Sequence, residues 1–263
     1  MAKKSAKSDR RAVVDQIRKK QRGAERARGM AIIGVCVVIA LAIVGVAAAK
    51  PVMSSIRLAE YGGKTLSEIG DSASAAGCQK AITLTTSTKK LATNGTYYLT
   101  APLAFASSYS AISSGTAASM STKFYTATTR PDLTTLLRNL SEGFTILWYD
   151  NTVSDTELDQ IRAIAKKFPG TTNYRYKFIA APWKSADEKT TKNKKKAHTV
   201  FPEGTHIAFS HWTGTDDSST SSYTTTSVQK GIIQYCSSVS GAALKTFMEK
   251  HPYTDSPDPT TAS

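Results

Sequence analysis

A group of polar residues stands directly before an aromatic-rich apolar run. Arg138, Asn139, Ser141 and Glu142 precede Gly143, and the run FTILWY follows. A cation, an amide, a hydroxyl and a carboxylate grouped before a strand could form a binding or catalytic site. If the segment is helical, Arg138 and Glu142 lie four residues apart and can pair with each other. We favour this structural role over a chemical one.

Other residue types suited to chemistry are not arranged in known patterns. The sequence contains no CxxC, HExxH, Walker, GxGxxG or GxSxG motif. His206 and His211 are five apart on a predicted strand, so their side chains point to opposite faces and cannot share a metal ion. Adjacent acids such as Asp216 and Asp217 diverge on an extended chain. The residues therefore predict no metal, no cofactor and no catalytic pair.

A lysine-rich loop lies in the second half of the chain. Its central charges are Lys192, Lys194, Lys195 and Lys196. Such a loop could contact anionic lipid, an acidic envelope polymer or an acidic partner. The alternative, which we favour, is a solvated loop that keeps the protein soluble.

The elements around the polar group predict an α+β fold. FTILWY is continuously apolar and rich in β-branched and aromatic residues, which is typical of a strand covered on both faces. A helix should follow from Ser154, because Ser154 and Glu157 form a capping box, and Pro169–Gly170 ends it. Residues 174–183 return as a strand. A strand, a helix and a strand predict parallel pairing through a crossover.

Further segments complete a mixed sheet with two flanking helices. Asn94–Gly95 is a strong hairpin signal. Residues 205–212 read as a strand, and the segment SVSGAALKTFMEKHPY reads as the second, amphipathic helix. We expect the folded domain to cover residues 78–252, after a stalk and linker at 50–77, and the tail at 253–263 to be disordered.

The charge of the chain is concentrated at its beginning. The net charge is +14, and residues 1–29 carry +8 of it, from eleven Lys or Arg and three acidic residues. No recognition motif accompanies this charge, so nucleic acid is not an expected partner. A basic segment beside a membrane is attracted to anionic lipid headgroups by about 1 kcal/mol per cation.

An uncharged apolar segment follows the basic leader. Residues 30–49 contain no charge, and ten of the twenty are Ile, Val or Leu. This length matches a membrane-spanning helix. A cleaved signal peptide is the alternative, but its apolar stretch is usually only about 7–15 residues long. We expect an uncleaved anchor with a cytoplasmic N-terminus and an extracytoplasmic C-terminal domain at the plasma membrane. Gly34 and Gly45 would allow a partner helix to approach closely.

Three cysteines are present. Cys36 lies in the apolar segment, whereas Cys78 and Cys236 lie in the part expected outside the membrane, where disulfides persist. We predict a Cys78–Cys236 bridge, with two free buried thiols as the alternative.

Several segments together resemble an uncharacterised actinobacterial family of single-pass envelope proteins. That family shows a His-polar-Leu-Glu-His-Gly motif before an apolar strand that ends in Tyr, and this chain has RNLSEG followed by FTILWY. The segments HIAFSHWTG and VQKGIIQYCSSVSGAALKTFMEKHPYTDSPDP are also similar, so the resemblance covers about residues 78–259. In this alignment Arg138, Ser141 and Glu142 replace the family's His, Glu and His, while Asn139 keeps the polar position and Gly143 is retained. A metal or catalytic site of the relatives would be lost here.

The resemblance and the layout imply a non-catalytic, membrane-anchored accessory or assembly subunit of an envelope membrane complex. Single-span proteins of this layout are similar to accessory subunits of the actinobacterial cytochrome bcc-aa3 supercomplex, which makes that complex the expected partner. Two alternatives remain open at this point. One is a metal-dependent or hydrolytic envelope enzyme with a pocket around Arg138, Glu142, His198 and His206. The other is a lipid- or polymer-binding module that uses the lysine-rich loop.

Overall fold

The structure is a computed structural model, and it describes residues 33, 35–40, 43, 53–85, 100–106, 112, 115–189, 200–215 and 228–259. The chain divides into two units, Met1–Ser55 and Ile56–Ser263. In the first unit, residues 33, 35–40 and 43 are helical. Among the described residues, no helix has both the length and the apolar character needed to cross a membrane. Most of the predicted span at 30–49, with Gly34 and Gly45, lies outside the described residues, as does the basic leader.

The second unit is built on a mixed five-stranded sheet, as the sequence predicted. Its strands are ordered β1–β5–β4–β2–β3, and only the β2–β3 pair is parallel. The strands are β1 (Ile82–Thr85), β2 (Thr145–Tyr149), β3 (Phe178–Pro182), β4 (Ile207–Thr215) and β5 (Val228–Cys236). The chain thus has the α+β class that was expected, but β5 was not recognised as a strand from the sequence.

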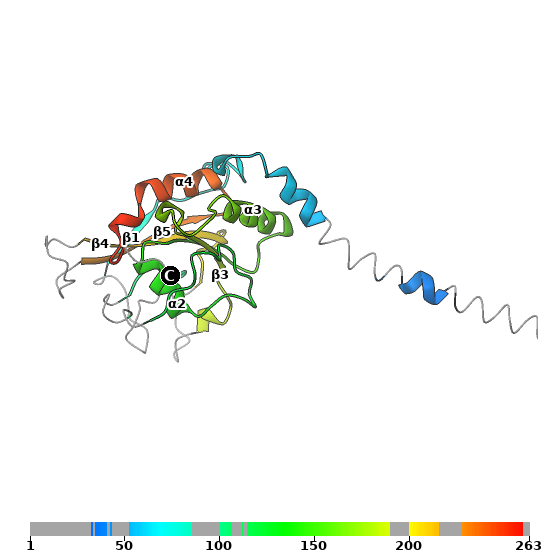
Figure 1. The fold of residues 1–263 in the computed structure, drawn as a ribbon, viewed down its shortest axis with the longest axis horizontal. Helices are drawn as coiled ribbons and strands as arrows, with labels where there is room; N and C mark the ends of the chain where they lie inside the picture. Colours follow the sequence, from blue (N-terminus) through cyan, green and yellow to red (C-terminus); the bar gives the residue numbers. More distant parts are fainter. Residues whose placement is uncertain are drawn as a thin grey trace, which may run out of the picture. The chain divides into compact units, whose positions relative to one another are not determined.

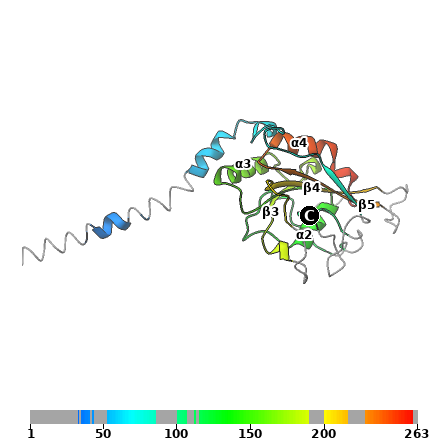
Figure 2. The same cartoon turned by 180° about the vertical axis from the view of Figure 1, so that it is seen from behind.

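Helices cover both faces of this sheet (Figures 1 and 2). The helices α3 (Asp155–Lys166) and α4 (Gly241–Lys250) pack on one face, and α2 (Leu133–Ser141) packs on the other. The expectation of two flanking helices is therefore wrong, because the segment with Arg138, Asn139 and Ser141 forms a third. Short 3-10 turns complete the unit: η1 (Leu66–Glu68), η3 (Tyr174–Tyr176), η4 (Asp187–Lys189) and η5 (Tyr253–Asp255).

The predicted crossover is confirmed. Strand β2 is buried along its whole length, and its side chains alternate between the two core layers, with Ile146 and Trp148 on the α2 side and Leu147 and Tyr149 on the α3 side. Burial on both faces explains why this strand reads as a continuous apolar run. The capping box that starts α3 is present, since the Ser154 hydroxyl accepts from the Glu157 N–H.

The segment expected to be a stalk and linker belongs to the folded unit from residue 56 onward. Arg57 forms a 2.6 Å ion pair with Asp159 of α3, whose side chain is almost fully buried. Further along, the Ile69 carbonyl accepts from the Gly241 N–H, and Gly70 bridges to Ser240. Residues 56–77 therefore pack against α3 and the start of α4 instead of separating the domain from what precedes it.

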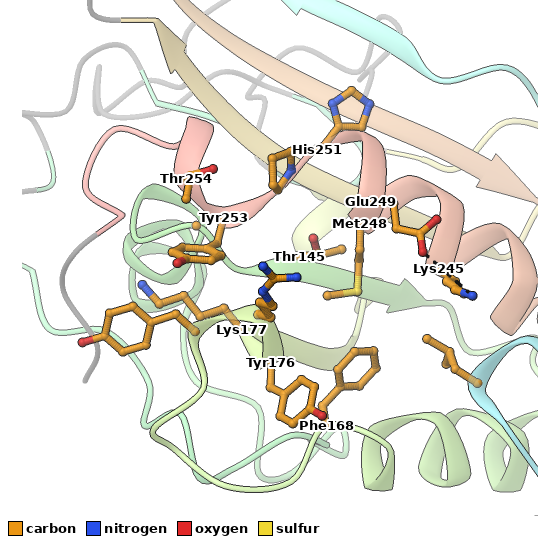
Figure 3. A pocket seen from close by; sticks show the side chains of 15 residues that line it. Thr145, Phe168, Tyr176, Lys177, Lys245, Met248, Glu249, His251, Tyr253 and Thr254 are labelled. Atoms are coloured by element: carbon orange, nitrogen blue, oxygen red, sulfur yellow. Dashed lines mark ion pairs between the residues drawn. The ribbon is translucent and has the colours of Figure 1, made fainter.

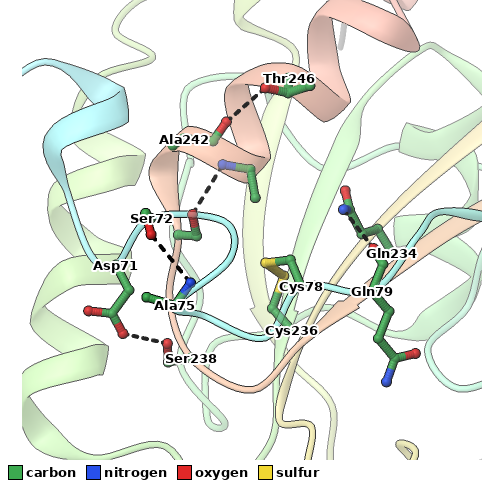
Figure 4. The surroundings of a disulfide bond; sticks show 12 residues. Asp71, Ser72, Ala75, Cys78, Gln79, Gln234, Cys236, Ser238, Ala242 and Thr246 are labelled. Atoms are coloured by element: carbon green, nitrogen blue, oxygen red, sulfur yellow. Dashed lines mark hydrogen bonds between the residues drawn. A yellow bond between two sulfur atoms is a disulfide. The ribbon is translucent and has the colours of Figure 1, made fainter.

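The predicted disulfide between Cys78 and Cys236 is present (Figure 4). It joins residue 78 to the end of β5. Hydrogen bonds hold the same two segments on either side of it, from Gln79 N–H to the Tyr235 carbonyl at 2.8 Å and from Ser237 N–H to the Ala76 carbonyl at 2.8 Å. The bridge therefore closes a contact that the backbone also makes.

Candidate functional site

The polar group RNLSEG lies at the C-terminal end of α2, where the chain turns into β2. The helix starts at an Asp132 cap and ends with Glu142 as its C-cap residue. Arg138, Asn139, Ser141 and Glu142 are all buried, although they are polar. Buried polar side chains require partners, and the partners of this group define what the group does.

Asn139 connects α2 to the loop before it. Its amide nitrogen donates to the Ala118 carbonyl at 2.8 Å, and its amide oxygen accepts from the Ala118 N–H at 2.9 Å. This pair of bonds fixes the backbone of residue 118 as a neighbouring strand would. The role of Asn139 is thus to hold a main-chain segment.

Arg138 pairs with two carboxylates. Its Nε lies 3.2 Å from Glu142 Oε1, the i, i+4 pair foreseen for a helical segment. Its Nη2 donates to Asp258 Oδ2 at 3.0 Å, across 120 residues of sequence. The side chains of Arg138, Glu142 and Asp258 are 10%, 4% and 14% exposed, so both pairs are shielded from water.

These contacts attach the C-terminal segment to the domain. We call residues 253–259 the C-terminal strap. The strap was expected to be part of a disordered tail, but the structure shows a 3-10 turn at η5 and buries Ser256. Asp258 N–H donates to the Ser141 carbonyl at 2.8 Å beside the ion pair. Asp255 Oδ1 lies 2.6 Å from Nε2 of His211, a fully buried residue of β4.

Lys177 provides a further attachment from the residue before β3. Its Nζ donates to the Glu142 carbonyl at 2.6 Å and to the Pro259 carbonyl at 2.9 Å. The same ammonium lies 4.3 Å from the ring centre of Tyr174 and 5.6 Å from that of Tyr253. Burial lowers the pKa of Lys177 to about 8, while the nearby carboxylates Glu142 and Asp258 act in the opposite direction.

Lys177→Met should therefore lower the free energy of unfolding by about 2–4 kcal/mol at pH 7, because two carbonyls lose a charged donor.

The folded-state pKa of Lys177, about 8, lies below the ordinary lysine value of 10.5. The folded protein then binds fewer protons than the unfolded chain between these values, so the contribution of Lys177 to stability rises with pH there, by up to about 1.4 kcal/mol per unit. Urea unfolding at pH 7 and pH 9 should show a larger gap between wild type and variant at pH 9. Exposed Lys166→Met is the control, and a gap that shrinks with pH contradicts the account.

Gly143 is required by the strap. Its φ of +92° is in the region that favours glycine. A Cβ at this position would lie 2.5 Å from the Tyr253 carbonyl oxygen and 2.9 Å from Ser256 Oγ. The glycine that follows the polar group is thus explained by the approach of the strap.

Gly143→Ala should lower the free energy of unfolding by roughly 2–4 kcal/mol, through backbone strain plus the collision with Tyr253. Gly170→Ala is a matched control, because Gly170 has a φ of +79° with no atom within 4 Å of the added Cβ. Chemical denaturation of the two variants should show the larger loss for Gly143→Ala. Equal losses of unfolding free energy in the two variants would mean that the strap does not contact the methyl group added at position 143.

His206 and His211 do not join the RNLSEG cluster. Nε2 of His206 lies 2.9 Å from Glu157 Oε1, at the start of α3, and His211 contacts Asp255. His198 and the loop lysines Lys192, Lys194, Lys195 and Lys196 lie outside the described residues, as does Asn94–Gly95. Within the described part of the chain, no three His, Cys, Asp or Glu side chains are grouped so as to hold a metal ion.

Sequence reasoning located Arg138, Asn139, Glu142 and Gly143 but missed their partners. Lys177 carried a usable signal, because a lysine inside the aromatic run YRYKF is out of place in a buried strand unless it is paired. Asp255 and Asp258 carried none, since a segment rich in Pro, Asp and Ser is typical of an unstructured tail.

Comparisons of the chain with protein-family models, curated proteins and solved structures found no match. The class that the fold and the cluster define is an α+β domain whose C-terminal segment is fastened by buried ion pairs.

Proposed function

We propose that the protein is a non-catalytic accessory or assembly subunit of an actinobacterial envelope membrane complex, anchored by residues 30–49. The observation that supports this proposal most directly is the pairing of Arg138 with two carboxylates of the same domain. Its guanidinium is placed between Glu142 and Asp258 and fastens the C-terminal strap. The residues that could have formed a site for chemistry thus contribute to a fixed surface instead.

Catalysis requires that a reactive side chain be accessible to a substrate. A general acid, base or nucleophile must reach a substrate within hydrogen-bonding distance. Glu142 is 3% exposed, and the contacts of Asn139 are with backbone groups of the same domain. A domain whose RNLSEG cluster is taken up by internal contacts is suited to binding another protein, and an anchor would keep it beside a membrane complex.

The proposed partners follow from the sequence. The basic leader would lie in the cytoplasm against anionic headgroups, and the partner helix would pack at Gly34 and Gly45. The cytochrome bcc-aa3 supercomplex is proposed as the complex on the strength of the resemblance and layout.

The test is purification of the tagged full-length chain from its native membrane in a mild detergent, followed by mass spectrometry of the proteins that remain bound. The proposal predicts subunits of one membrane complex in a fixed ratio to the chain. A variant with Gly34→Leu and Gly45→Leu should lose them while still reaching the membrane. A wild-type chain that purifies alone would contradict the proposal, and bound metal in the same sample would favour the enzyme alternative.

A further inference from the structure

A hollow of about 420 Å³ lies in the folded unit next to the strap (Figure 3). Its volume is within the range of pockets that hold small ligands, about 300–1,000 Å³. Residues from the end of α3, from η3, from α4 and from the strap line it. None of the roles assigned above uses this space.

Phenyl, phenol and thioether side chains line part of the hollow. They are Phe168, Tyr174, Tyr176, Met248 and Tyr253. Aromatic rings and methionine sulfur favour a planar apolar body, because they offer flat and polarisable surfaces.

The walls are fixed before any ligand binds. Phe168 stacks on Phe178 at 4.4 Å between ring centres and meets Tyr176 edge to face at 6.0 Å. Tyr174 and Tyr253 meet edge to face at 6.0 Å, and both lie against the Lys177 ammonium. A pocket with walls already in place loses less entropy on binding.

The charges around the hollow favour an anion. Arg175, Lys177 and Lys245 line it together with a single carboxylate, Glu249. Lys245 and Glu249 lie 3.9 Å apart, and both are more than half exposed, so they neutralise each other weakly. Even if Lys177 is assigned to Glu142 and Asp258, Arg175 and Lys245 outnumber Glu249.

We propose that this hollow is a binding site for a small aromatic carboxylate, with the ring between the tyrosines and Phe168 and the carboxylate toward Arg175 and Lys245. The site does not depend on the membrane partner. Failure of this proposal would therefore leave the proposed accessory role unaffected, and the reverse also holds.

The test uses the full-length chain and isothermal titration calorimetry with 4-hydroxyphenylacetate as the probe. Tyramine, which has a similar phenol ring and a positive charge, is the matched ligand control. We expect the carboxylate to bind and tyramine to bind at least about tenfold more weakly, since a charged hydrogen bond is exchanged for a repulsion. No heat of binding up to 10 mM carboxylate, or equal affinity for tyramine, would overturn the proposal.

Two variants locate the binding. Arg175→Gln removes an exposed cation at the rim and should weaken carboxylate binding by about fivefold or more, whereas Lys166→Gln, an exposed cation on α3 outside the hollow, should not change it. Met248→Trp should fill the space and abolish binding, with the melting temperature as a check that the domain is folded. If Arg175→Gln binds the carboxylate as tightly as the wild type does, the ligand lies elsewhere and the proposal is overturned. This conclusion does not depend on the result for Met248→Trp.

Discussion

Arg138→Met is expected to lower the free energy of unfolding by about 3–5 kcal/mol, because it removes the guanidinium from its ion pairs with two shielded carboxylates. Glu142 and Asp258 are 4% and 14% exposed, so water compensates for the loss only in part. Urea unfolding can be followed by tryptophan fluorescence, since Trp148, Trp183 and Trp212 are buried in the core layer that α2 covers.

The matched control is Lys245→Met, which breaks the exposed pair with Glu249 and should change stability by less than about 1 kcal/mol. The double variant Arg138→Met/Glu142→Gln should lose less than the two single variants together, because the second change removes one uncompensated charge. A loss for Arg138→Met as small as that of the control would mean that the pairs are not shielded in solution.

Removal of the disulfide should have an effect of similar size. The bridge joins residues 158 apart in sequence, so it restricts a long loop of the unfolded chain. The chain-entropy model gives a stabilisation on the order of 5 kcal/mol for a loop of this length. Cys78→Ala/Cys236→Ala should lower the denaturation midpoint accordingly, and a reducing agent should lower that of the wild type to a similar value.

The control for this experiment is Cys36→Ala. Cys36 lies in the other unit and is not bonded to another cysteine, so its replacement should leave the unfolding of the second unit unchanged. If a reducing agent leaves the wild-type midpoint where it was, the backbone contacts around the bridge hold these segments without it.

The elements with local signals were predictable from the sequence. The capping box at Ser154 and Glu157 placed the start of α3, and the unbroken apolar run placed β2 between two layers. The α+β class followed from the order of these elements, and the disulfide followed from the two cysteines expected outside the membrane.

The elements that depend on distant contacts were not predictable. The segment VQKGIIQYC has polar residues near both ends and a glycine near its middle, so it does not read as a strand, yet β5 lies between β1 and β4. The strap is composed like a tail, and side chains distant in the sequence, such as Arg138, Lys177 and His211, hold it. These contacts join residues that are far apart in the sequence. They cannot be predicted from local patterns, because the residues around one partner give no indication of the other.

The most direct test of the central claim, that the RNLSEG cluster fastens the strap, is amide hydrogen exchange at Asp258. Its N–H donates to the Ser141 carbonyl at 2.8 Å beside the Arg138–Asp258 pair. We predict slow exchange in the wild type and exchange at least about tenfold faster in Arg138→Met, with the amides of β2 still protected. Exchange at Asp258 in the wild type as fast as in an unfolded peptide would contradict the account.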